Sequence, residues 1–397
     1  MRKPRKPGLA KRVAVVLAVA ILLAAVILLV PRVRGKLIQV FGPYYWEFKK
    51  YTHPYREVDP GEAGNGGPAS EILLQDPMGI DVDRGGNIYV SDRGRLIWKI
   101  APDGTATVVG GTGQGGLPPD GALALEADLG RPQGLCLDAE GRIYFADSRN
   151  DLVLRIEADG TLTRIAGTGE RGFSGDGGPA TDAALNVPFD VRVDGEGSVF
   201  ITDFGNHRIR KVTPDGRIHT VAGTGEAGYS GDGGRAEAAK LDGPYGSLPT
   251  PDGGLLIADS GNNAVRRVDA EGIITTIAGT DERGFSGDDG PASAARLDSP
   301  QSLYLGPGGR IYVNDEHNHA IRVIDPDGTI SLVVGTGQPG LAADGVPGEG
   351  APLNDPEDLA LGPDGSLFIT DADNARVIVI DTEGRLRHIA GRPKEED

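Results

Sequence analysis

The sequence predicts an all-β protein: a six-bladed β-propeller of four-stranded blades, preceded by one N-terminal transmembrane helix. Three observations carry this prediction. A short template that ends in Asp recurs six times at spacings of 55 or 56 residues, the 397 residues include 62 Gly and 28 Pro, and residues 13–30 form an uninterrupted apolar run. Gly and Pro at this level disfavour helix bundles, because both interrupt helices, and favour short strands joined by tight turns.

The N-terminal apolar run predicts a membrane anchor. Its 18 residues would span about 27 Å as a helix, close to the thickness of the bilayer hydrocarbon. No small-x-small cleavage site follows the run, which favours an uncleaved signal anchor over a cleaved signal peptide. Six basic residues precede the run and three follow it. The positive-inside rule therefore predicts a cytoplasmic basic tail at residues 1–12, a single pass through the cell membrane at residues 13–30 and an extracytoplasmic body.

The segment after the run, residues 31–56, is predicted to be an aromatic juxtamembrane linker. Seven aromatic residues lie within fifteen positions, namely Phe41, Tyr44, Tyr45, Trp46, Phe48, Tyr51 and Tyr55. Amphipathic rings favour the headgroup layer of a membrane. The alternative is that these rings pad the underside of the body.

Charge is divided unevenly along the chain. The first fifty residues carry a net charge of +10 and the remaining 347 carry −27, which together give −17. So acidic a body repels phosphate backbones, and this excludes nucleic acid as an expected partner. The single Cys136 excludes an internal disulfide, a thiolate metal cluster and CxxC redox chemistry.

Residues 57–397 form the body and consist of one unit repeated six times. The six copies of the template end at Asp92, Asp147, Asp203, Asp259, Asp315 and Asp371. A proline marker repeats in phase with them, at Pro77, Pro132, Pro188, Pro244, Pro300 and Pro356. Two independent markers in phase over six copies indicate a true repeat architecture.

The third copy illustrates the predicted blade. Alternating and β-branched apolar residues predict strands at about residues 190–193, 198–202, 208–213 and 217–222, separated by turn residues. Four strands per copy with radial repetition is the pattern of a propeller. The last copy ends with almost no loop, whereas residues 57–77 match the Gly-rich loops between copies. We therefore expect residues 57–77 to join the last blade to the first.

The repeat resembles that of NHL-repeat β-propellers. The Asn-His and Arg-Ile signature around the third strand stands here as Asn206-His207-Arg208-Ile209-Arg210 and Asn318-His319-Ala320-Ile321-Arg322, with weaker forms at Asn262 and Asn374. The Gly-Phe-Ser-Gly-Asp-Gly-Gly-Pro-Ala loops resemble those of long-repeat bacterial NHL proteins. The resemblance covers residues 57–397 and implies the fold; it implies no single function, because this fold serves many. The first blade departs from the pattern, since residues 92–95 are one residue short and lack the Asn.

The six copies provide an internal control, because a residue found in every blade builds the blade. The repeated strand-end aspartates are therefore expected to be structural and to accept N–H groups of the following turn. His207 and His319 share one repeat position and are also expected to be structural. Zinc is not expected, because the histidines lack the three-fold arrangement of the amidating-lyase relatives of this fold.

The Gly-rich loops carry an acid and an apolar residue at repeated positions. The acids are Asp120, Asp176, Asp232, Asp288 and Asp344. One or two carboxylates per loop are too few for Ca²⁺, which takes roughly six to eight oxygens. The apolar position holds Leu117, Phe173, Tyr229, Phe285 and Leu341, which we expect to anchor the loops on the sheets.

The two residues after each marker proline are expected at the mouth of the propeller axis, because the first strand of each blade lines that axis. Six polar residues break a neutral pattern there and form the candidate ligand-binding site: Asp190, Glu357, Asp358, Gln133, Gln301 and Ser302. Converging polar groups of this kind bind a cation or a polar ligand. Six-bladed relatives of the lactonase type hold Ca²⁺ at such a place, so the resemblance implies Asp190, Glu357 and Asp358 as possible Ca²⁺ ligands. The alternative is an acidic, water-filled channel.

The leading hypothesis is a non-enzymatic recognition module, a sensor or scaffold that requires no cofactor. It would bind a protein, peptide or glycan on the loop-rich face. The first alternative is a Ca²⁺-dependent lactonase or esterase that uses the axial acids. The second is a structural component of the cell envelope.

Overall fold

The computed structural model describes residues 57–392. The predicted basic tail at residues 1–12, the anchor at 13–30 and the linker at 31–56 lie outside the described residues and stay predictions. Within residues 57–392, no helix has the length and apolar character needed to cross a membrane.

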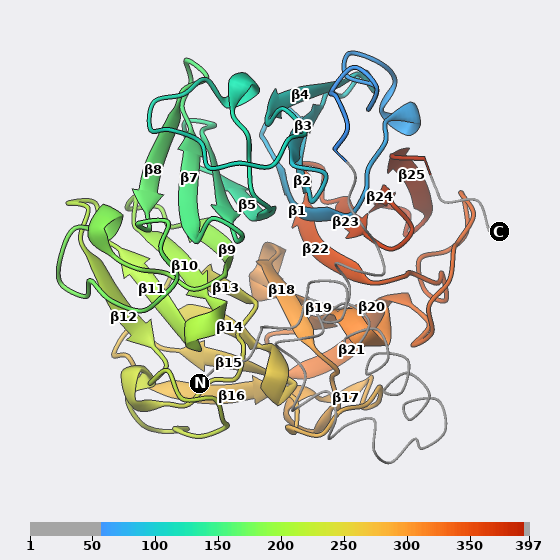
Figure 1. Cartoon of the computed structure of the whole chain (residues 1–397). Coiled ribbons are helices and arrows are strands. Elements are labelled where there is room, and N and C mark those ends of the chain that lie inside the picture. Colours follow the sequence, from blue (N-terminus) through green and yellow to red (C-terminus); the bar gives the residue numbers. More distant parts are fainter. Residues whose placement is uncertain (1–56, 393–397) are drawn as a thin grey trace, which may run out of the picture. The chain divides into compact units, whose positions relative to one another are not determined.

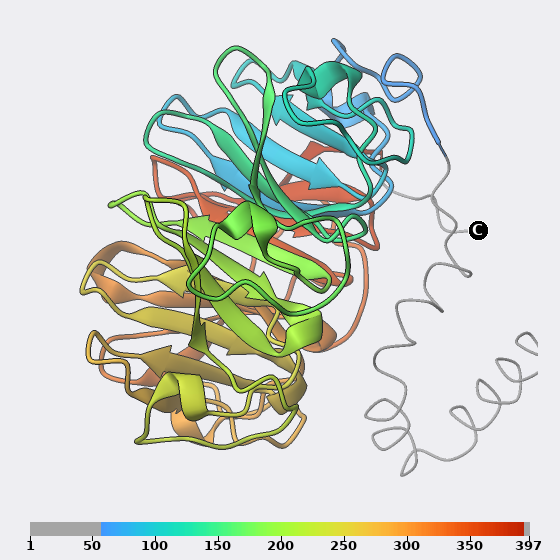
Figure 2. The ribbon, with the colours of Figure 1, turned by 60° about the vertical axis from the view of Figure 1, so that its left-hand side comes forward.

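The predicted all-β propeller is confirmed. Six antiparallel sheets surround a central axis, and each sheet is built from one continuous stretch of chain with its four main strands in sequence order (Figure 1). Turning the ribbon shows neighbouring sheets stacked face to face (Figure 2). In the third copy the observed strands match the predicted ones to within two residues.

The blades have the following strands. Blade 1 comprises β1 (Pro77–Val82), β2 (Ile88–Asp92), β3 (Leu96–Ile100) and β4 (Ala106–Gly110). Blade 2 comprises β5 (Pro132–Leu137), β6 (Ile143–Asp147), β7 (Leu152–Ile156) and β8 (Leu162–Ala166). Blade 3 comprises β9 (Pro188–Val193), β10 (Val199–Asp203), β11 (Arg208–Val212) and β12 (Ile218–Ala222).

The second half of the ring repeats this plan. Blade 4 comprises β13 (Gly246–Pro249), β14 (Leu255–Asp259), β15 (Ala264–Val268) and β16 (Ile274–Ala278). Blade 5 comprises β18 (Pro300–Leu305), β19 (Ile311–Asp315), β20 (Ala320–Ile324) and β21 (Thr329–Gly335), with the two-residue edge strand β17 (Gly290–Pro291). Blade 6 comprises β22 (Pro356–Leu361), β23 (Leu367–Asp371), β24 (Arg376–Ile380) and β25 (Leu386–Ala390).

Short 3-10 helices punctuate the connections between and within blades. They are η1 (Ala69–Glu71), η2 (Ala124–Glu126), η3 (Ala180–Asp182), η4 (Phe204–Asn206), η5 (Ala236–Ala238), η6 (Ser260–Asn262), η7 (Ala292–Ala294), η8 (Pro307–Gly309) and η9 (Glu316–Asn318).

The ring closes as the sequence predicts, through the loop that precedes blade 1. The N–H of Gly391, just after β25, donates to the carbonyl of Ala69 at 3.0 Å. The same bond joins Gly167 to Ala180 between blades 2 and 3, also at 3.0 Å. The N-terminal loop therefore joins the last blade to the first in the way that each inner loop joins its neighbours.

The inner strands converge so closely that small residues are needed at some positions. A Cβ placed on Gly79 would lie 2.5 Å from the backbone nitrogen of Leu135 in the next blade, and one on Gly134 would lie 2.9 Å from Cα of Asp190. The backbones approach each other there because glycine has no side chain. At these two positions, blades 1 and 2 therefore place no side chain at the axis.

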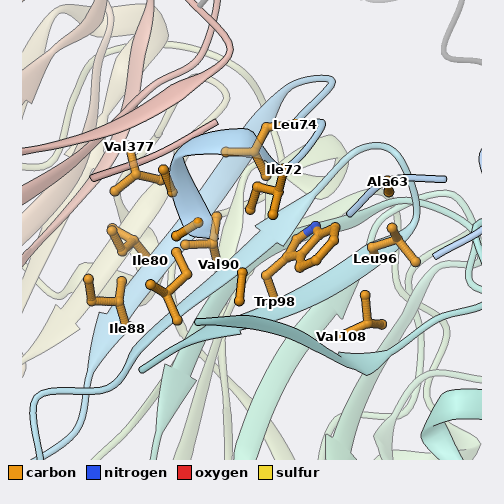
Figure 3. Close-up of a cluster of buried hydrophobic side chains, with 14 of the residues drawn as sticks. Ala63, Ile72, Leu74, Ile80, Ile88, Val90, Leu96, Trp98, Val108 and Val377 are labelled. Atoms are coloured by element: carbon orange, nitrogen blue, oxygen red, sulfur yellow. The ribbon is translucent and has the colours of Figure 1, made fainter. Parts of the chain in front are cut away.

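Apolar side chains fill the space between adjacent blades. In blade 1, Ile80, Val90, Trp98 and Val108 occupy successive strands in register and form one buried row (Figure 3). Val377 of blade 6 belongs to the same cluster. Full burial of such a side chain contributes about 1.5–3 kcal/mol, so these rows hold the ring together.

The strand-end aspartates are structural, as expected, but in every blade they also accept the N–H of a loop that the sequence did not predict as their partner. In blade 3, Asp203 accepts the N–H of Asn186 at 2.8 Å and the side-chain amide of Asn206 at 2.8 Å. The backbone donor belongs to the loop before the marker proline, not to the following turn. That loop enters beside the end of the second strand, where its N–H has no ladder partner, and the carboxylate supplies one.

Blades 3, 4 and 5 each bury an arginine in the middle of the third strand: Arg210, Arg266 and Arg322, all 0 % exposed. In blade 4, Arg266 lies 3.1 Å from the strand-end Asp259 and 2.6 Å from the loop acid Asp232. The ring of Tyr229 covers the guanidinium at 4.9 Å. Phe173 and Phe285 lie over Arg210 and Arg322 in the same way. These loop rings therefore cover a buried cation, and three of the loop acids neutralise it.

Candidate functional site

The candidate residues lie at the starts of the inner strands, and each is at most 6 % exposed. Gln133 is on β5, Asp190 on β9, Gln301 and Ser302 on β18, and Glu357 and Asp358 on β22. All except Gln133 line one axial cavity, together with Met78, Gly79, Gly134, Phe189, Arg192, Tyr245 and Gly246. The amide of Gln133 instead donates to the hydroxyl of Ser148 at 3.2 Å.

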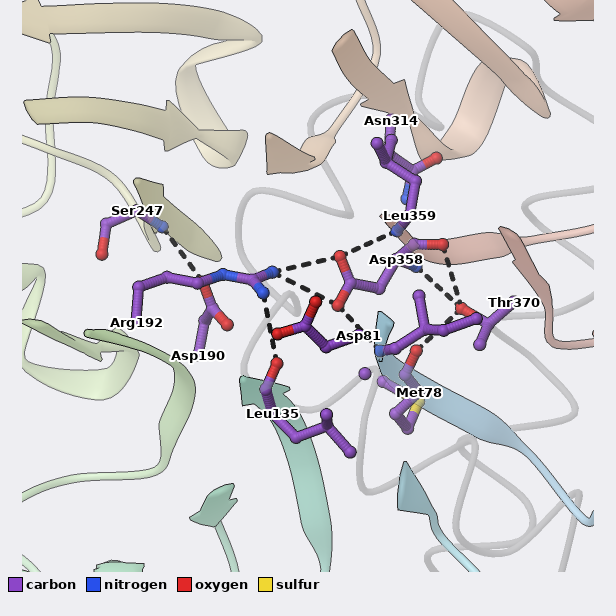
Figure 4. A network of polar contacts seen from close by, with 12 residues as sticks. Met78, Asp81, Leu135, Asp190, Arg192, Ser247, Asn314, Asp358, Leu359 and Thr370 are labelled. Carbon is purple, nitrogen blue, oxygen red and sulfur yellow. Dashed lines mark hydrogen bonds and ion pairs between the residues drawn. The ribbon is translucent and has the colours of Figure 1, made fainter. Parts of the chain in front are cut away.

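An arginine joins the axial acids into what we call the axial network: Asp81, Asp190, Arg192 and Asp358 (Figure 4). The guanidinium of Arg192 donates to Asp358 at 3.2 Å and to the carbonyl of Leu135 at 3.1 Å, and its Nε lies 3.4 Å from Asp190. Asp358 also accepts the N–H of Ile80 at 3.0 Å. The network thus ties blades 1, 2, 3 and 6 together across the axis.

Burial controls the protonation of this network. Desolvation raises the pKa of Asp190 to about 6, and the nearby Arg192 opposes the rise. Burial also raises the pKa of Asp81. Burial lowers the pKa of Arg192, but Asp190 and Asp358 more than reverse this effect and hold it above the ordinary value. The guanidinium therefore stays charged between its two carboxylates.

The axial network does not fit the Ca²⁺ site that the resemblance implied. Two of the three expected ligands, Asp190 and Asp358, are already bridged by the guanidinium of Arg192. A dication placed among them would be repelled by a fixed positive charge in a buried environment, where such repulsion is strong. We derive no chemical step through Ca²⁺ at these residues.

A second group of carboxylates, which we call the mouth cluster, comprises Glu316, Asp355 and Glu357. Carboxylate oxygens of these three buried residues all lie within 4.8 Å of one another, close enough to share one cation. Ser299 donates its hydroxyl proton to Glu316 at 2.9 Å, and Nε2 of His317 lies 3.6 Å from Glu316. The mouth cluster therefore brings Glu357 together with two acids that sequence reasoning did not select.

Two cations border the mouth cluster. Arg93 lies 3.9 Å from Glu357 and 2.7 Å from Asp76. His317 lies beside Glu316, which raises the pKa of the imidazole to about 9 against the opposing effect of burial. Both side chains are therefore positively charged near neutral pH and flank the cluster.

The backbone of Asp355 is held in an unusual conformation by the preceding blade. Its φ is +57°, in the left-handed region that non-glycine residues seldom adopt. The N–H of Asp355 donates to Nδ1 of His319 at 3.0 Å. Burial lowers the pKa of His319, which keeps the imidazole neutral and able to accept this bond. His319 thus has the structural role expected of it and positions an acid of the mouth cluster.

An aromatic wall of Phe189, Phe204 and Tyr245 stands on the blade 3 and blade 4 side of the axis. The ring centroids of Phe189 and Tyr245 are 4.3 Å apart, and Phe204 lies 5.0 Å from Phe189 and 5.1 Å from Tyr245. Burial, reinforced by the charge of Glu316, raises the pKa of Tyr245 well above its usual value. The wall therefore adjoins the mouth cluster through a neutral phenol.

The axial cavity is small. Its volume is about 30 Å³, whereas an apolar cavity that holds one benzene molecule measures about 150 Å³ and one water needs about 10–15 Å³. The cavity therefore admits two or three water-sized groups, and a sugar or lactone ring does not fit inside it. The site can hold a compact cationic or polar group, with aromatic surface on one side and carboxylates on the other.

The internal repeat contains the signal that would have found Asp81, Arg93, Arg192 and Glu316, but not Asp355, which directly precedes its marker proline. Four residues after the marker proline, the blades carry Asp81, Cys136, Arg192, Leu248, Tyr304 and Ala360. Directly after the strand-end aspartate they carry Arg93, Ser148, Phe204, Ser260, Glu316 and Ala372. Charged and aromatic departures stand out at both positions. The same internal control, applied beyond the two residues after the proline, would have selected them.

Comparison with known proteins supports the fold and leaves several functions possible. No family model matches the chain. Over 288 aligned residues it is 30 % identical to Protein SUPPRESSOR OF QUENCHING 1, chloroplastic, of Arabidopsis thaliana. The alignment covers 69 % of this chain and 27 % of that protein. The chain thus spans about a quarter of the length of this curated relative.

Two solved structures show the same fold at low sequence identity. An auxiliary nutrient binding protein from Bacteroides thetaiotaomicron has a TM-score of 0.59 at 13 % identity, over 82 % of this chain and 72 % of that one. A gluconolactonase from Xanthomonas campestris has a TM-score of 0.53 at 16 % identity, over 84 % of this chain and 94 % of that one. Because a binding protein and a hydrolase share the fold, the likeness assigns no activity. The chain is a six-bladed β-propeller module with structural neighbours of both kinds.

Proposed function

We propose that the chain is a membrane-anchored recognition module of the NHL type. Its propeller lies outside the cytoplasm and binds a protein, peptide or glycan on the face of the axial mouth, where the Gly-rich loops enter the inner strands. Residues 13–30 are the anchor, residues 1–12 the cytoplasmic tail and residues 31–56 the linker. The module requires no cofactor and catalyses no reaction.

The observation that carries this proposal is the position of Arg192. Its guanidinium bridges Asp190 and Asp358, so the carboxylates that a metal-dependent hydrolase would place on the axis are already neutralised. The small cavity supports the same conclusion, because a ring-sized substrate does not reach the axial acids. What the mouth offers a partner is a small cavity lined by acids and aromatic rings.

Chemical crosslinking on intact cells tests the proposal. We expect the full chain to yield a crosslinked adduct of defined mass, and a control consisting of residues 1–56 alone to yield none. Absence of any adduct above the anchor-only control would contradict the recognition function. Protease added to intact cells tests the topology, since the propeller is degraded only if it faces outward.

A Ca²⁺-dependent lactonase or esterase is the second candidate, and the mouth cluster is the observation that favours it. Three carboxylates within 4.8 Å of one another are typical of a site for a hard cation. This candidate predicts that the melting temperature of the full chain falls in EDTA and recovers with Ca²⁺, because a ligand of the folded state stabilises it. It also predicts lactone or ester hydrolysis that is lost in Glu357→Gln. An unchanged melt without hydrolysis would eliminate it.

A further inference from the structure

We propose that the axial mouth captures the side-chain ammonium group of a lysine presented by the bound protein or peptide. The inference rests on the proposed recognition function and specifies the chemistry of its ligand. It joins three features of the mouth: the mouth cluster, the aromatic wall, and two buried polar atoms, Nε2 of Gln301 and Oγ of Ser302, that have no hydrogen-bond partner among residues 57–392.

The mouth cluster has the dimensions of an ammonium site. A protonated amine carries three N–H donors and no acceptor, and charge-assisted N–H···O bonds are about 2.8 Å long. Three acceptors around one such nitrogen therefore lie up to about 4.6 Å apart. The oxygens of Glu316, Asp355 and Glu357 all lie within 4.8 Å of one another, so small side-chain adjustments place all three around one nitrogen.

Gln301 and Ser302 independently indicate a ligand. They are 2 % and 5 % exposed and line the same cavity as Glu357 and Tyr245. Within residues 57–392, neither Nε2 of Gln301 nor Oγ of Ser302 has a hydrogen-bond partner. A buried polar group without a partner is costly. A polar ligand that enters the cavity removes this cost, so both atoms point to a ligand there.

The aromatic wall selects a lysine over a metal ion. Ca²⁺ needs oxygen ligands on all sides, but Phe189, Phe204 and Tyr245 offer ring carbons on one side of the site. Aromatic faces attract an ammonium group and pack against its alkyl stem. The fixed charges of Arg93 and His317 at the border also disfavour a dication more than a monocation.

The size of the cavity selects an alkylammonium over an amino sugar. A volume of about 30 Å³ accommodates a water-sized ammonium and one or two methylene groups. In a lysine, four methylene groups separate the charge from the backbone, so the partner's main chain stays outside the mouth. In an amino sugar the charge is attached directly to a ring, which the cavity does not admit.

Binding of small probes to the full chain tests the inference. The probe is Nα-acetyl-lysine N-methylamide, and the matched probe is its norleucine analogue, which has an alkyl side chain without the amine. Glucosamine and CaCl₂ are the competing cations. We expect the norleucine analogue and glucosamine to bind at least tenfold more weakly than the lysine probe, as measured by ligand-observed NMR.

Protein variants locate the site. Glu357→Gln removes one acceptor charge and Tyr245→Leu removes part of the wall, and we expect each to weaken lysine-probe binding at least tenfold. Glu383→Gln is the matched control, because Glu383 is an exposed glutamate in the turn before β25. The comparison of lysine with norleucine uses the unaltered protein, so it decides the question even if a variant does not fold.

The outcomes separate this inference from the proposed function. Equal binding of lysine and norleucine probes, or binding of Ca²⁺ in place of the lysine probe, would overturn the lysine site. A crosslinked partner that persists with Glu357→Gln and after acetylation of its lysines would also overturn it, while the recognition function stands. Failure to capture any partner would overturn the recognition function itself.

Discussion

Blades 3, 4 and 5 differ from blades 1, 2 and 6 at the middle of the third strand. The first group buries Arg210, Arg266 and Arg322 there, and the second group buries Trp98, Leu154 and Ile378. The loop side chain changes with it: the arginines lie under Phe173, Tyr229 and Phe285, whereas Leu117 and Leu341 hold that loop position before blades 2 and 6. The buried arginine and the aromatic ring of the preceding loop therefore occur together in the same blades. A buried charge is stable only where its partner side chains are also present.

The largest effect is expected from removing the carboxylate that pairs with a buried arginine. Asp259→Ala leaves Arg266 with only the half-exposed Asp232 as its acid, and we expect a loss of about 3–5 kcal/mol in the free energy of unfolding. Asp147→Ala is the control in blade 2, where Leu154 replaces the arginine, and about 1–3 kcal/mol is expected there. Urea denaturation of both variants measures the difference. Equal losses would show that the arginine does not depend on this carboxylate.

A smaller effect is expected from removing the ring above the arginine. Tyr229→Leu keeps Arg266 and both of its acids but removes the aromatic face 4.9 Å away. We expect a loss of about 1 kcal/mol, the usual size of a partly desolvated cation–π contact. Thermal melts read the change. A variant as stable as the wild type would mean that the alternation of rings and leucines has another cause.

Replacing both the buried arginine of blade 4 and the ring above it is expected to lower the free energy of unfolding less than removing the carboxylate alone. The double variant Tyr229→Leu/Arg266→Leu gives blade 4 the residues that blade 2 carries at both positions. Asp259 keeps its hydrogen bonds from Asp242 and Asn262, and Asp147 of blade 2 has the equivalent bonds without an arginine. We therefore expect a loss smaller than that of Asp259→Ala, below about 3 kcal/mol. A loss as large as that of Asp259→Ala would contradict the grouping.

The smallest effect is expected from pH, and it separates blade 5 from blades 3 and 4. Only blade 5 has Glu316-His317 after the strand-end aspartate, and Glu316 raises the pKa of His317 to about 9. Because the folded-state pKa is raised, the stabilisation is fully present below about pH 6.5 and is lost as pH rises through 9. The difference in melting temperature between wild type and His317→Gln should therefore shrink from pH 6.5 to pH 9.5. A constant difference would contradict the ion pair.

Much of the fold could be predicted because it repeats. Six copies of one template define the blade number, the strand order and, through the loop at residues 57–77, the closure of the ring. The candidate site could be predicted only in part. Five of the six selected residues line the axial cavity, but Arg192, Glu316 and Asp355 were missed, because they lie outside the two positions after the marker proline.

The sequence by itself determined the architecture, since the periods of apolar residues, turn glycines and marker prolines are local patterns that each blade satisfies alone. Only the tertiary structure decided what the axial acids do. Asp190, Arg192 and Asp358 are separated by up to 168 residues, and they meet because the closed ring brings blades 3 and 6 together across the axis. Whether a carboxylate binds a metal, a ligand or a neighbouring arginine depends on the charges that surround it after folding.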